Sequence, residues 1–188
     1  MVRQPSINAQ HRAPLSTERI IEAALRIVDG QGLGRLTMRR LGDSLEVEAM
    51  AIYHHLPRGK EQLLDGLVAH VASAPADDAP SRRWQDVLRG WAADYRGRLM
   101  AHAGVLPLVV TRRNPAALTA TVASLREVMR RGGVAEDAAA VAAHALLSYV
   151  IGHTALEVRG TGEDGADRAV DWDARFQAGL DLLLTGVR

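Results

Sequence analysis

The chain has 188 residues, enough for one medium-sized domain or two small ones, and its 47% apolar content is typical of a packed globular protein rather than a disordered one. Its 23 Lys and Arg nearly balance its 22 Asp and Glu, so the net charge of +1 does not by itself indicate any class of partner. No cysteine is present, which excludes disulfides and thiolate metal sites and is compatible with a reducing compartment.

Residues 1–14 carry Gln, Asn, Pro and scattered Arg, and we interpret them as a flexible arm without a secretory signal. Ser16 is then a typical N-cap residue, and Glu18 lies in the first helical turn, where an acid is favoured. Apolar residues recur at helical spacing, at Ile20, Ile21, Ala24, Leu25, Ile27 and Val28. This pattern predicts a first helix. The glycines at positions 30, 32 and 34 end it, since a phosphate-binding glycine loop would instead follow a strand.

Two short helices joined by a tight turn follow. Thr37 caps the first, which runs to Leu45, Glu46 and Val47 form the turn, and residues 48–55 form the second helix. In a helix-turn-helix, the second helix lies in the major groove of DNA while the first braces the DNA backbone. The order of elements therefore predicts a DNA-binding unit.

A break at residues 57–59 precedes a fourth helix that begins at Lys60. Its apolar face, formed by Leu63, Leu64, Leu67, Val68 and Val71, predicts that it packs back onto the first three helices. Residues 73–81 are rich in Ala, Pro and Asp, and we interpret them as a linker. Further helices are predicted near residues 82–101, 115–131, 136–159 and 171–185, with a loop at 161–166.

No strand pattern occurs in the sequence, so we expect an all-α protein. Its expected parts are the arm at residues 1–14, an N-terminal three-helix helix-turn-helix domain at 15–74, and a C-terminal helical ligand-binding and dimerisation domain at 75–188.

The string LTMRRLGDSLEVEAMAIYHHLPRGKEQLLDGL at residues 36–67 resembles the DNA-binding domain of TetR-family transcriptional repressors, and the resemblance covers residues 16–72. Its most specific elements are Thr37, Arg39, Leu41, Val47, Tyr53, Lys60 and the pair Leu63 and Leu64. The resemblance implies a homodimer that binds a palindromic operator and releases it when a small molecule occupies the C-terminal domain.

The resemblance also implies DNA contacts. Thr37, Tyr53 and Lys60 match positions that contact phosphates, and Arg39 matches a base or phosphate contact. The second helix carries no Arg, Lys, Asn or Gln, so its direct readout depends on methyl groups and on Glu48, which can accept from a cytosine amino group. The full expected set is Thr37, Arg39, Arg40, Glu48, Ala49, Met50, Ala51, Tyr53, His54, His55 and Lys60. Which of the two histidines faces DNA is left open, and the turn before Lys60 is one residue longer than is usual in the family.

The string FQAGLDLLLTG at the C-terminus resembles the final helix of tetracycline-repressor-type regulatory domains. A stripe of small residues on the preceding helix permits close helix packing. We expect the two helices to form a four-helix dimer interface through Val141, Ala145, Ser148, Gly152, Ala155, Phe176, Gly179, Leu180 and Leu183. The alternative is that both stripes fill the core of one protomer.

A small-molecule pocket is expected among aliphatic residues and a few polar groups, namely Trp91, Tyr95, Met100, His102, Leu106, Val110, Met129 and Tyr149. Each of these can equally be an ordinary core residue. The histidines show no metal-ligand spacing, so we expect no metal site. Val109 and Val110 stand where metal-tetracycline repressors place a histidine, which disfavours tetracycline as the effector.

An enzyme and a protein-binding adaptor are the alternative functions. No Ser, Asp or Glu is arranged with His in a recognisable catalytic motif, so we expect neither enzymatic activity nor a cofactor. An adaptor that keeps the helix-turn-helix fold without specific DNA binding stays open, because the second helix is weakly charged. Polar residues interrupt the apolar run at 138–156, so we expect no membrane span and a cytoplasmic protein.

Overall fold

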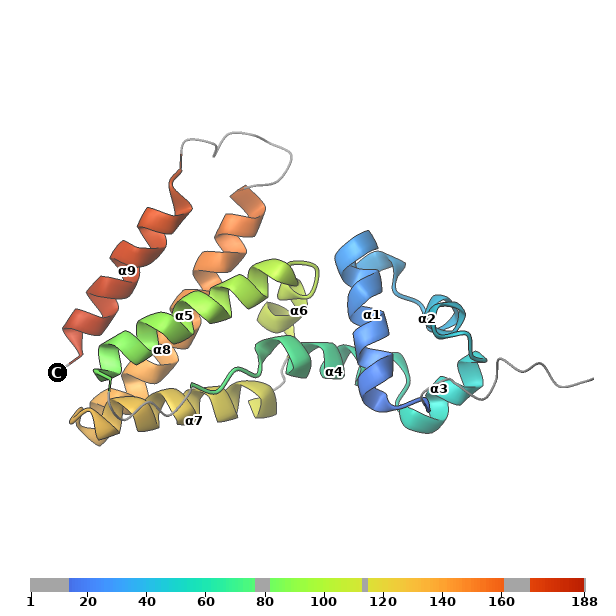
Figure 1. The fold of residues 1–188 in the computed structure, drawn as a ribbon, viewed down its shortest axis with the longest axis horizontal. Coiled ribbons are helices and arrows are strands. Elements are labelled where there is room, and N and C mark those ends of the chain that lie inside the picture. The colour runs from blue at the N-terminus through green and yellow to red at the C-terminus, as the bar shows by residue number, and fades with distance from the viewer. Residues whose placement is uncertain (1–13, 77–81, 113–114, 161–169, 188) are drawn as a thin grey trace, which may run out of the picture.

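The computed structural model describes residues 14–76, 82–112, 115–160 and 170–187, in which every regular element is a helix (Figure 1). The N-terminal part contains α1 (Thr17–Gln31), the short 3-10 helix η2 (Leu33–Arg35), α2 (Met38–Leu45), α3 (Ala49–His55) and α4 (Lys60–Ala72). The C-terminal part contains α5 (Trp84–Ala101), α6 (Leu106–Thr111), α7 (Pro115–Arg131), α8 (Glu136–Gly160) and α9 (Trp172–Gly186). The prediction of an all-α protein is confirmed. Residues 1–13 of the arm predicted at 1–14, residues 77–81 of the linker predicted at 73–81, and the predicted loop at 161–166 lie outside the described residues.

Side-chain caps begin α1 and α2. The Ser16 Oγ accepts a hydrogen bond from the Arg19 backbone N–H at 3.2 Å, and the Thr37 Oγ1 accepts one from the Arg40 N–H at 3.1 Å. Such a bond satisfies an N–H that has no partner inside the helix. Both caps were predicted from the sequence, and both are confirmed.

The turn between α2 and α3 is closed by Glu46, which has the left-handed φ of 56°. Its N–H donates to the end of α2, as in a typical helix C-cap. Gly42 permits the tight return of the chain, because a Cβ at this position would lie only 2.8 Å from the Val47 carbonyl oxygen. The turn therefore fixes α3 closely against α2.

α4 joins the two parts of the molecule. In Figure 1 it runs from the group formed by α1, α2 and α3 to the bundle of α5 to α9, and it contacts α1 on one side and α5, α6 and α7 on the other. Its predicted apolar face, Leu63, Leu64, Leu67, Val68 and Val71, is buried. The buried side chains of both parts form one continuous cluster, and α4 packs on helices of both parts.

α8 is the central helix of the C-terminal bundle, where it packs against α5, α7 and α9. Its buried side chains include Leu146, Leu147 and Val150, and Phe176 and Leu180 of α9 complete this layer. By length and composition, α8 is the one helix among the described residues that could cross a membrane. Within the bundle, 33% of its apolar window is buried.

The predicted C-terminal helices agree with α5, α7, α8 and α9 to within two residues at each end. α6 was not predicted as a helix. It has six residues and contains Pro107 in its first turn, so it is too short to show a helical period in the sequence.

Candidate DNA-binding surface and regulatory contacts

The predicted recognition helix α3 has one fully buried side chain and exposes most of the others. Ile52 is fully buried in the N-terminal core, whereas Met50, Tyr53, His54 and His55 are exposed. One buried anchor on a seven-residue helix leaves the remaining faces accessible to a partner. Both histidines point to solvent in the free protein, so burial does not distinguish which of them faces DNA.

None of the eleven predicted DNA contacts is buried. Ala49 and Ala51 are half-buried, and the other nine are exposed: Thr37, Arg39, Arg40, Glu48, Met50, Tyr53, His54, His55 and Lys60. They lie on α2, on α3 and at the start of α4, that is, on the helix-turn-helix and the residues that follow it.

A basic groove of about 660 Å³ lies between the end of α1 and α2. Its lining residues are Ile27, Gln31, Gly34, Arg35, Thr37, Arg39, Arg40, Asp43 and Ser44. Arg35 was not among the predicted contacts. Arg35 follows the glycines that end the first predicted helix and was not assigned to any helix. Its position beside Arg39 and Arg40 is therefore seen only in the folded chain.

The turn between α3 and α4 supports the ring of Tyr53. Gly59 has a φ of 58°, and a Cβ there would lie 2.8 Å from Cε1 of the Tyr53 ring. The Gly59 N–H donates to the Leu56 carbonyl at 2.8 Å, which closes the turn. The Tyr53 ring and the turn therefore pack against each other, and Lys60 follows this turn at the start of α4.

The eight predicted pocket residues do not gather around one cavity. Trp91 and Tyr95 stack at 5.1 Å and line a groove of about 310 Å³ between α5 and the end of α4. The other lining residues are Ser73, Ala74, Pro75, Arg82, Val87, Gly90, Asp94 and Arg98. The Trp91 Nε1–H donates to the Ala74 carbonyl at 2.6 Å, and burial raises the pKa of Tyr95 to about 12.

The remaining predicted pocket residues lie elsewhere. Leu106 and Met129 are buried in the core, Met100 is half-buried and Val110 is exposed. The Tyr149 ring stacks on Phe176, and its hydroxyl donates to the Phe176 carbonyl at 2.9 Å. The His102 Nδ1 lies 2.9 Å from Asp29 Oδ2, which links the end of α5 to α1.

The nine predicted interface residues divide into two groups. Phe176 and Leu180 are fully buried within the protomer, and Gly179 faces the Tyr149 hydroxyl so closely that a Cβ would lie 2.3 Å from it. These three fill the contact between α8 and α9, as the alternative interpretation supposed. The others are exposed or half-buried: Val141, Ala145, Ser148, Gly152, Ala155 and Leu183. Leu156 and Leu182, which were not among the predicted interface residues, are large exposed apolar side chains on these same two helices.

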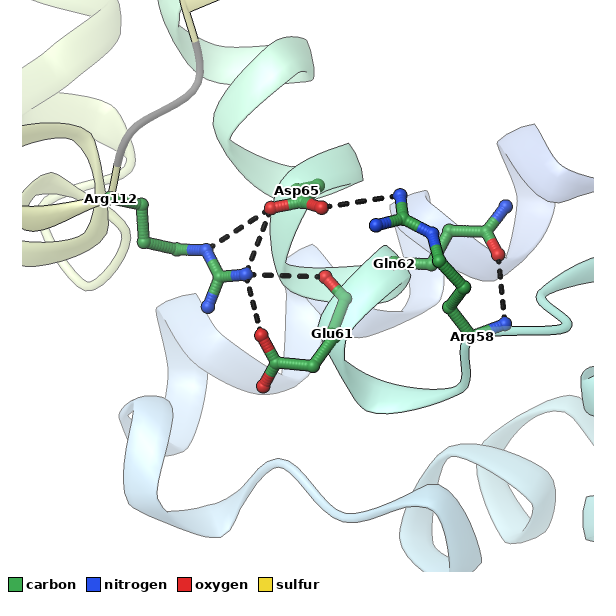
Figure 2. A network of polar contacts seen from close by, with 5 residues as sticks. All are labelled: Arg58, Glu61, Gln62, Asp65 and Arg112. Carbon is green, nitrogen blue, oxygen red and sulfur yellow. Dashed lines mark hydrogen bonds and ion pairs between the residues drawn. The ribbon is translucent and has the colours of Figure 1, made fainter.

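Arg112, at the end of α6, binds two carboxylates of α4 (Figure 2). Its Nη2 donates to Glu61 Oε2 at 2.8 Å and to Asp65 Oδ1 at 2.9 Å. These hydrogen bonds raise the pKa of Arg112, that from Glu61 contributing most. On the far side of α4, Arg58 Nη2 donates to Asp65 Oδ2 at 3.3 Å. This network was not predicted, because its members are up to 54 positions apart and lie in no shared motif.

A second ionic cluster joins α5, α8 and α9. Arg96 Nε and Nη2 donate to the two oxygens of Glu157 at 2.8 and 2.6 Å, and Arg96 Nη1 lies 2.7 Å from Asp173. The guanidinium also lies over the Phe176 ring, 4.9 Å from its centroid. The side chains of Arg96 and Glu157 are 16% and 8% exposed, so this is a largely buried ion pair.

His153 lies beside this cluster, and burial lowers its pKa below the ordinary 6.5. Glu157 opposes this effect, while Arg96 and Arg175 add to it. The imidazole is 9% exposed, and among the described residues its Nε2 has no hydrogen-bond partner. The folded protein therefore holds His153 neutral at a pH where the unfolded chain takes up a proton.

This predicts that acid destabilises the fold through His153. A histidine whose pKa is lowered in the folded state makes the unfolding free energy fall as the pH drops below the unfolded value near 6.5. Urea unfolding at a series of pH values between 7.5 and about 5 measures this slope. His153→Gln should show a shallower slope in the same window. An identical slope in both proteins would remove His153 from the explanation.

Comparison with known proteins places this geometry in a family. Residues 20–67, which span α1 to α4, match the family of bacterial regulatory proteins described as the tetR family. The tetracycline repressor protein class A from transposon 1721 of Escherichia coli is 30% identical over 202 residues, which cover 92% of this chain and 90% of the repressor. The chain belongs to the tetR family.

Two solved TetR-like structures cover nearly the whole chain. BioQ bound to its double-stranded DNA operator is 27% identical, with a TM-score of 0.72 over 92% of this chain and 98% of BioQ. TetR-Q116A from Acinetobacter baumannii AYE, in complex with minocycline, is 25% identical, with a TM-score of 0.75 over 92% and 96% of the two chains. TetR-family proteins are DNA-binding transcriptional regulators rather than enzymes, and this chain is such a regulator.

Proposed function

We propose that this TetR-family protein is a homodimeric repressor, which binds a palindromic operator through α3 and is released from it by a small-molecule effector. The exposed recognition helix, anchored by Ile52 alone, is the observation that supports DNA reading most directly. The likeness to BioQ in complex with its operator supports the same role for the helix-turn-helix. A cytoplasmic location follows from this function and is part of the proposal.

Within this proposal, phosphate contacts position the protein and α3 reads base edges. Thr37, Tyr53 and Lys60 contact phosphates, and Arg39 contacts a phosphate or a guanine. Small side chains on α3 suit contacts with thymine methyl groups, and Glu48 accepts from a cytosine amino group. The basic residues Arg35 and Arg40 add attraction to the DNA backbone beside α2.

The dimer in this proposal forms through the exposed apolar faces of α8 and α9. Val141, Ser148 and Gly152 lie on one side of α8, and Leu156 extends that side toward its C-terminus. Leu182 exposes a large apolar side chain on α9. Exposed apolar patches of this kind mark interaction sites, and a symmetric pairing of two such helices from each protomer covers them.

This dimer predicts that a charge placed on its exposed α8 face separates the protomers. Val141→Glu should lower the mass of the particle from twice the chain mass of 20.3 kDa to 20.3 kDa, because a buried unpaired carboxylate is costly. Light scattering after size-exclusion chromatography measures the mass. Ala93→Glu adds the same charge at an exposed site on α5 and should leave the dimer intact. A dimeric Val141→Glu protein would contradict this interface.

The effector in this proposal binds the C-terminal bundle next to Trp91 and Tyr95, where a groove opens between α5 and the end of α4. Aromatic rings with a few polar groups nearby are typical of small-molecule sites. The minocycline held by the Acinetobacter baumannii neighbour supports a ligand-binding role for this bundle.

Selection of DNA from a random pool tests the proposed function. Purified full-length protein should enrich one inverted repeat at physiological salt, where counterion-driven association with any sequence is weak. The two half-sites should be centred one DNA turn apart, about 34 to 36 Å, or modestly more. Enrichment of a single half-site would contradict the proposal that a homodimer binds the DNA. No enrichment with dimerisation retained would favour an adaptor that uses the helix-turn-helix fold for protein binding.

A further inference from the structure

Asp65 is shared by two arginines that approach α4 from opposite sides (Figure 2). Its Oδ1 accepts from Arg112 Nε at 3.2 Å and from Arg112 Nη2 at 2.9 Å. Its Oδ2 accepts from Arg58 Nη2 at 3.3 Å. One arginine comes from α6 in the C-terminal bundle, and the other from the turn directly after the recognition helix. A single carboxylate therefore connects the regulatory part with the DNA-binding part.

The two arginines are held unequally. Arg112 is 23% exposed and makes a forked contact with Asp65 together with a second bond to Glu61. Arg58 is 68% exposed and donates one long hydrogen bond to Asp65. A carboxylate that is already neutralised by a forked arginine attracts a second cation only weakly. The hold of Asp65 on Arg58 therefore depends on where Arg112 lies.

The backbone at Arg58 is held more firmly than its exposed guanidinium, which makes one long hydrogen bond to Asp65. The Arg58 N–H donates to Gln62 Oε1 at 3.2 Å, and the next residue, Gly59, packs under the Tyr53 ring. Lys60 follows at the start of α4. Arg58 thus lies between two residues that we place on DNA phosphates, and a guanidinium binds phosphate oxygens well.

We propose that Arg58 is a further contact to the DNA backbone and that Arg112 controls its availability through Asp65. With Arg112 on Asp65, the Arg58 guanidinium is available to a phosphate. When α6 withdraws Arg112, Asp65 keeps its full charge and captures Arg58. This inference rests on the proposed function, in which α3 binds an operator and the bundle responds to an effector.

The salt dependence of operator binding tests this coupling, because it counts phosphate contacts. The slope of log affinity against log salt changes by about 0.9 for each phosphate contact, so loss of Arg58 from both half-sites should reduce it by about 1.8. Arg58→Gln should show this reduction directly. Arg112→Gln should show a similar reduction, although Arg112 lies on α6, away from the recognition helix.

The decisive variant is the double mutant Arg112→Gln/Asp65→Asn. Without the Asp65 charge, Arg58 is released, and the double mutant should recover the wild-type slope. The matched control is Arg112→Gln/Glu61→Gln, which removes the other carboxylate bound by Arg112 and should not recover it. Circular dichroism and particle mass establish that each variant is folded and dimeric.

Three results would overturn the inference. The first is an unchanged slope in Arg58→Gln, which would show that Arg58 makes no phosphate contact. The second is a recovery of the wild-type salt slope in Arg112→Gln/Glu61→Gln that is as full as in Arg112→Gln/Asp65→Asn, because this would show a general effect of charge rather than a specific role of Asp65. The third is failure of the wild-type protein to bind any selected DNA, which would refute the proposed function and this inference with it.

Discussion

Arg96→Met is expected to lower the free energy of unfolding by about 3 kcal/mol, because it leaves a buried carboxylate without its cation. The side chain of Glu157 is 8% exposed and receives both of its strong hydrogen bonds from Arg96. The variant also loses the packing of the guanidinium on Phe176. Urea unfolding at one fixed protein concentration measures the loss, since the stability of the proposed dimer would depend on concentration.

Arg89 provides the matched control. It joins the same two helices, α5 and α9, through a forked contact with Asp181, but this pair is exposed. Exposed ion pairs contribute about 0 to 1 kcal/mol, so Arg89→Met should have a small effect. The double variant Arg96→Met/Glu157→Leu should recover much of the stability lost by Arg96→Met alone, because no unpaired charge is left buried. Equal losses for Arg96→Met and Arg89→Met would contradict the importance of burial at this cluster.

Arg39→Ala is expected to give the largest single effect on DNA binding among the α2 variants. Arg39 is exposed at the start of α2 and lines the basic groove with Arg35 and Arg40. If it contacts phosphate, all DNA sequences should be bound more weakly, with a salt slope reduced by about 0.9 per half-site. If it contacts guanine, discrimination at one base pair should fall by about 1 to 3 kcal/mol.

Fluorescence anisotropy with the selected operator and single-base variants separates these two roles of Arg39. Arg130→Ala removes an arginine from α7, in the C-terminal bundle, and serves as the charge control. An operator affinity of Arg39→Ala equal to that of the wild type would remove Arg39 from the contact set.

Local features of the fold were predictable from the sequence because they depend on residues a few positions apart. Ser16 and Thr37 each cap the helix that follows by accepting a hydrogen bond from the backbone N–H three residues ahead, and the apolar period of α4 specifies which face is buried. The short helix α6 was missed for the opposite reason, since six residues do not complete two turns. Its position between α4 and α8 is set by packing rather than by its own sequence.

The contacts between distant elements could not be predicted. The sequence contains many acidic residues that could pair with Arg112. Asp65, 47 positions away, is its partner because α6 packs on α4. Phe176 has the spacing of an interface residue, but Tyr149 and Arg96 cover it within the protomer. A helical stripe shows that a face is buried without showing which partner buries it. For the same reason, the sequence did not distinguish pocket residues from core residues.

The most direct measurement for the central claim is the affinity of the purified protein for the inverted repeat that it is proposed to bind, compared with scrambled DNA of equal length at physiological salt. A specific reader should bind the repeat at least about 10³-fold more tightly, the lower end of the range for specific regulators. Nearly equal affinities for the two DNAs would contradict sequence-specific recognition by α3.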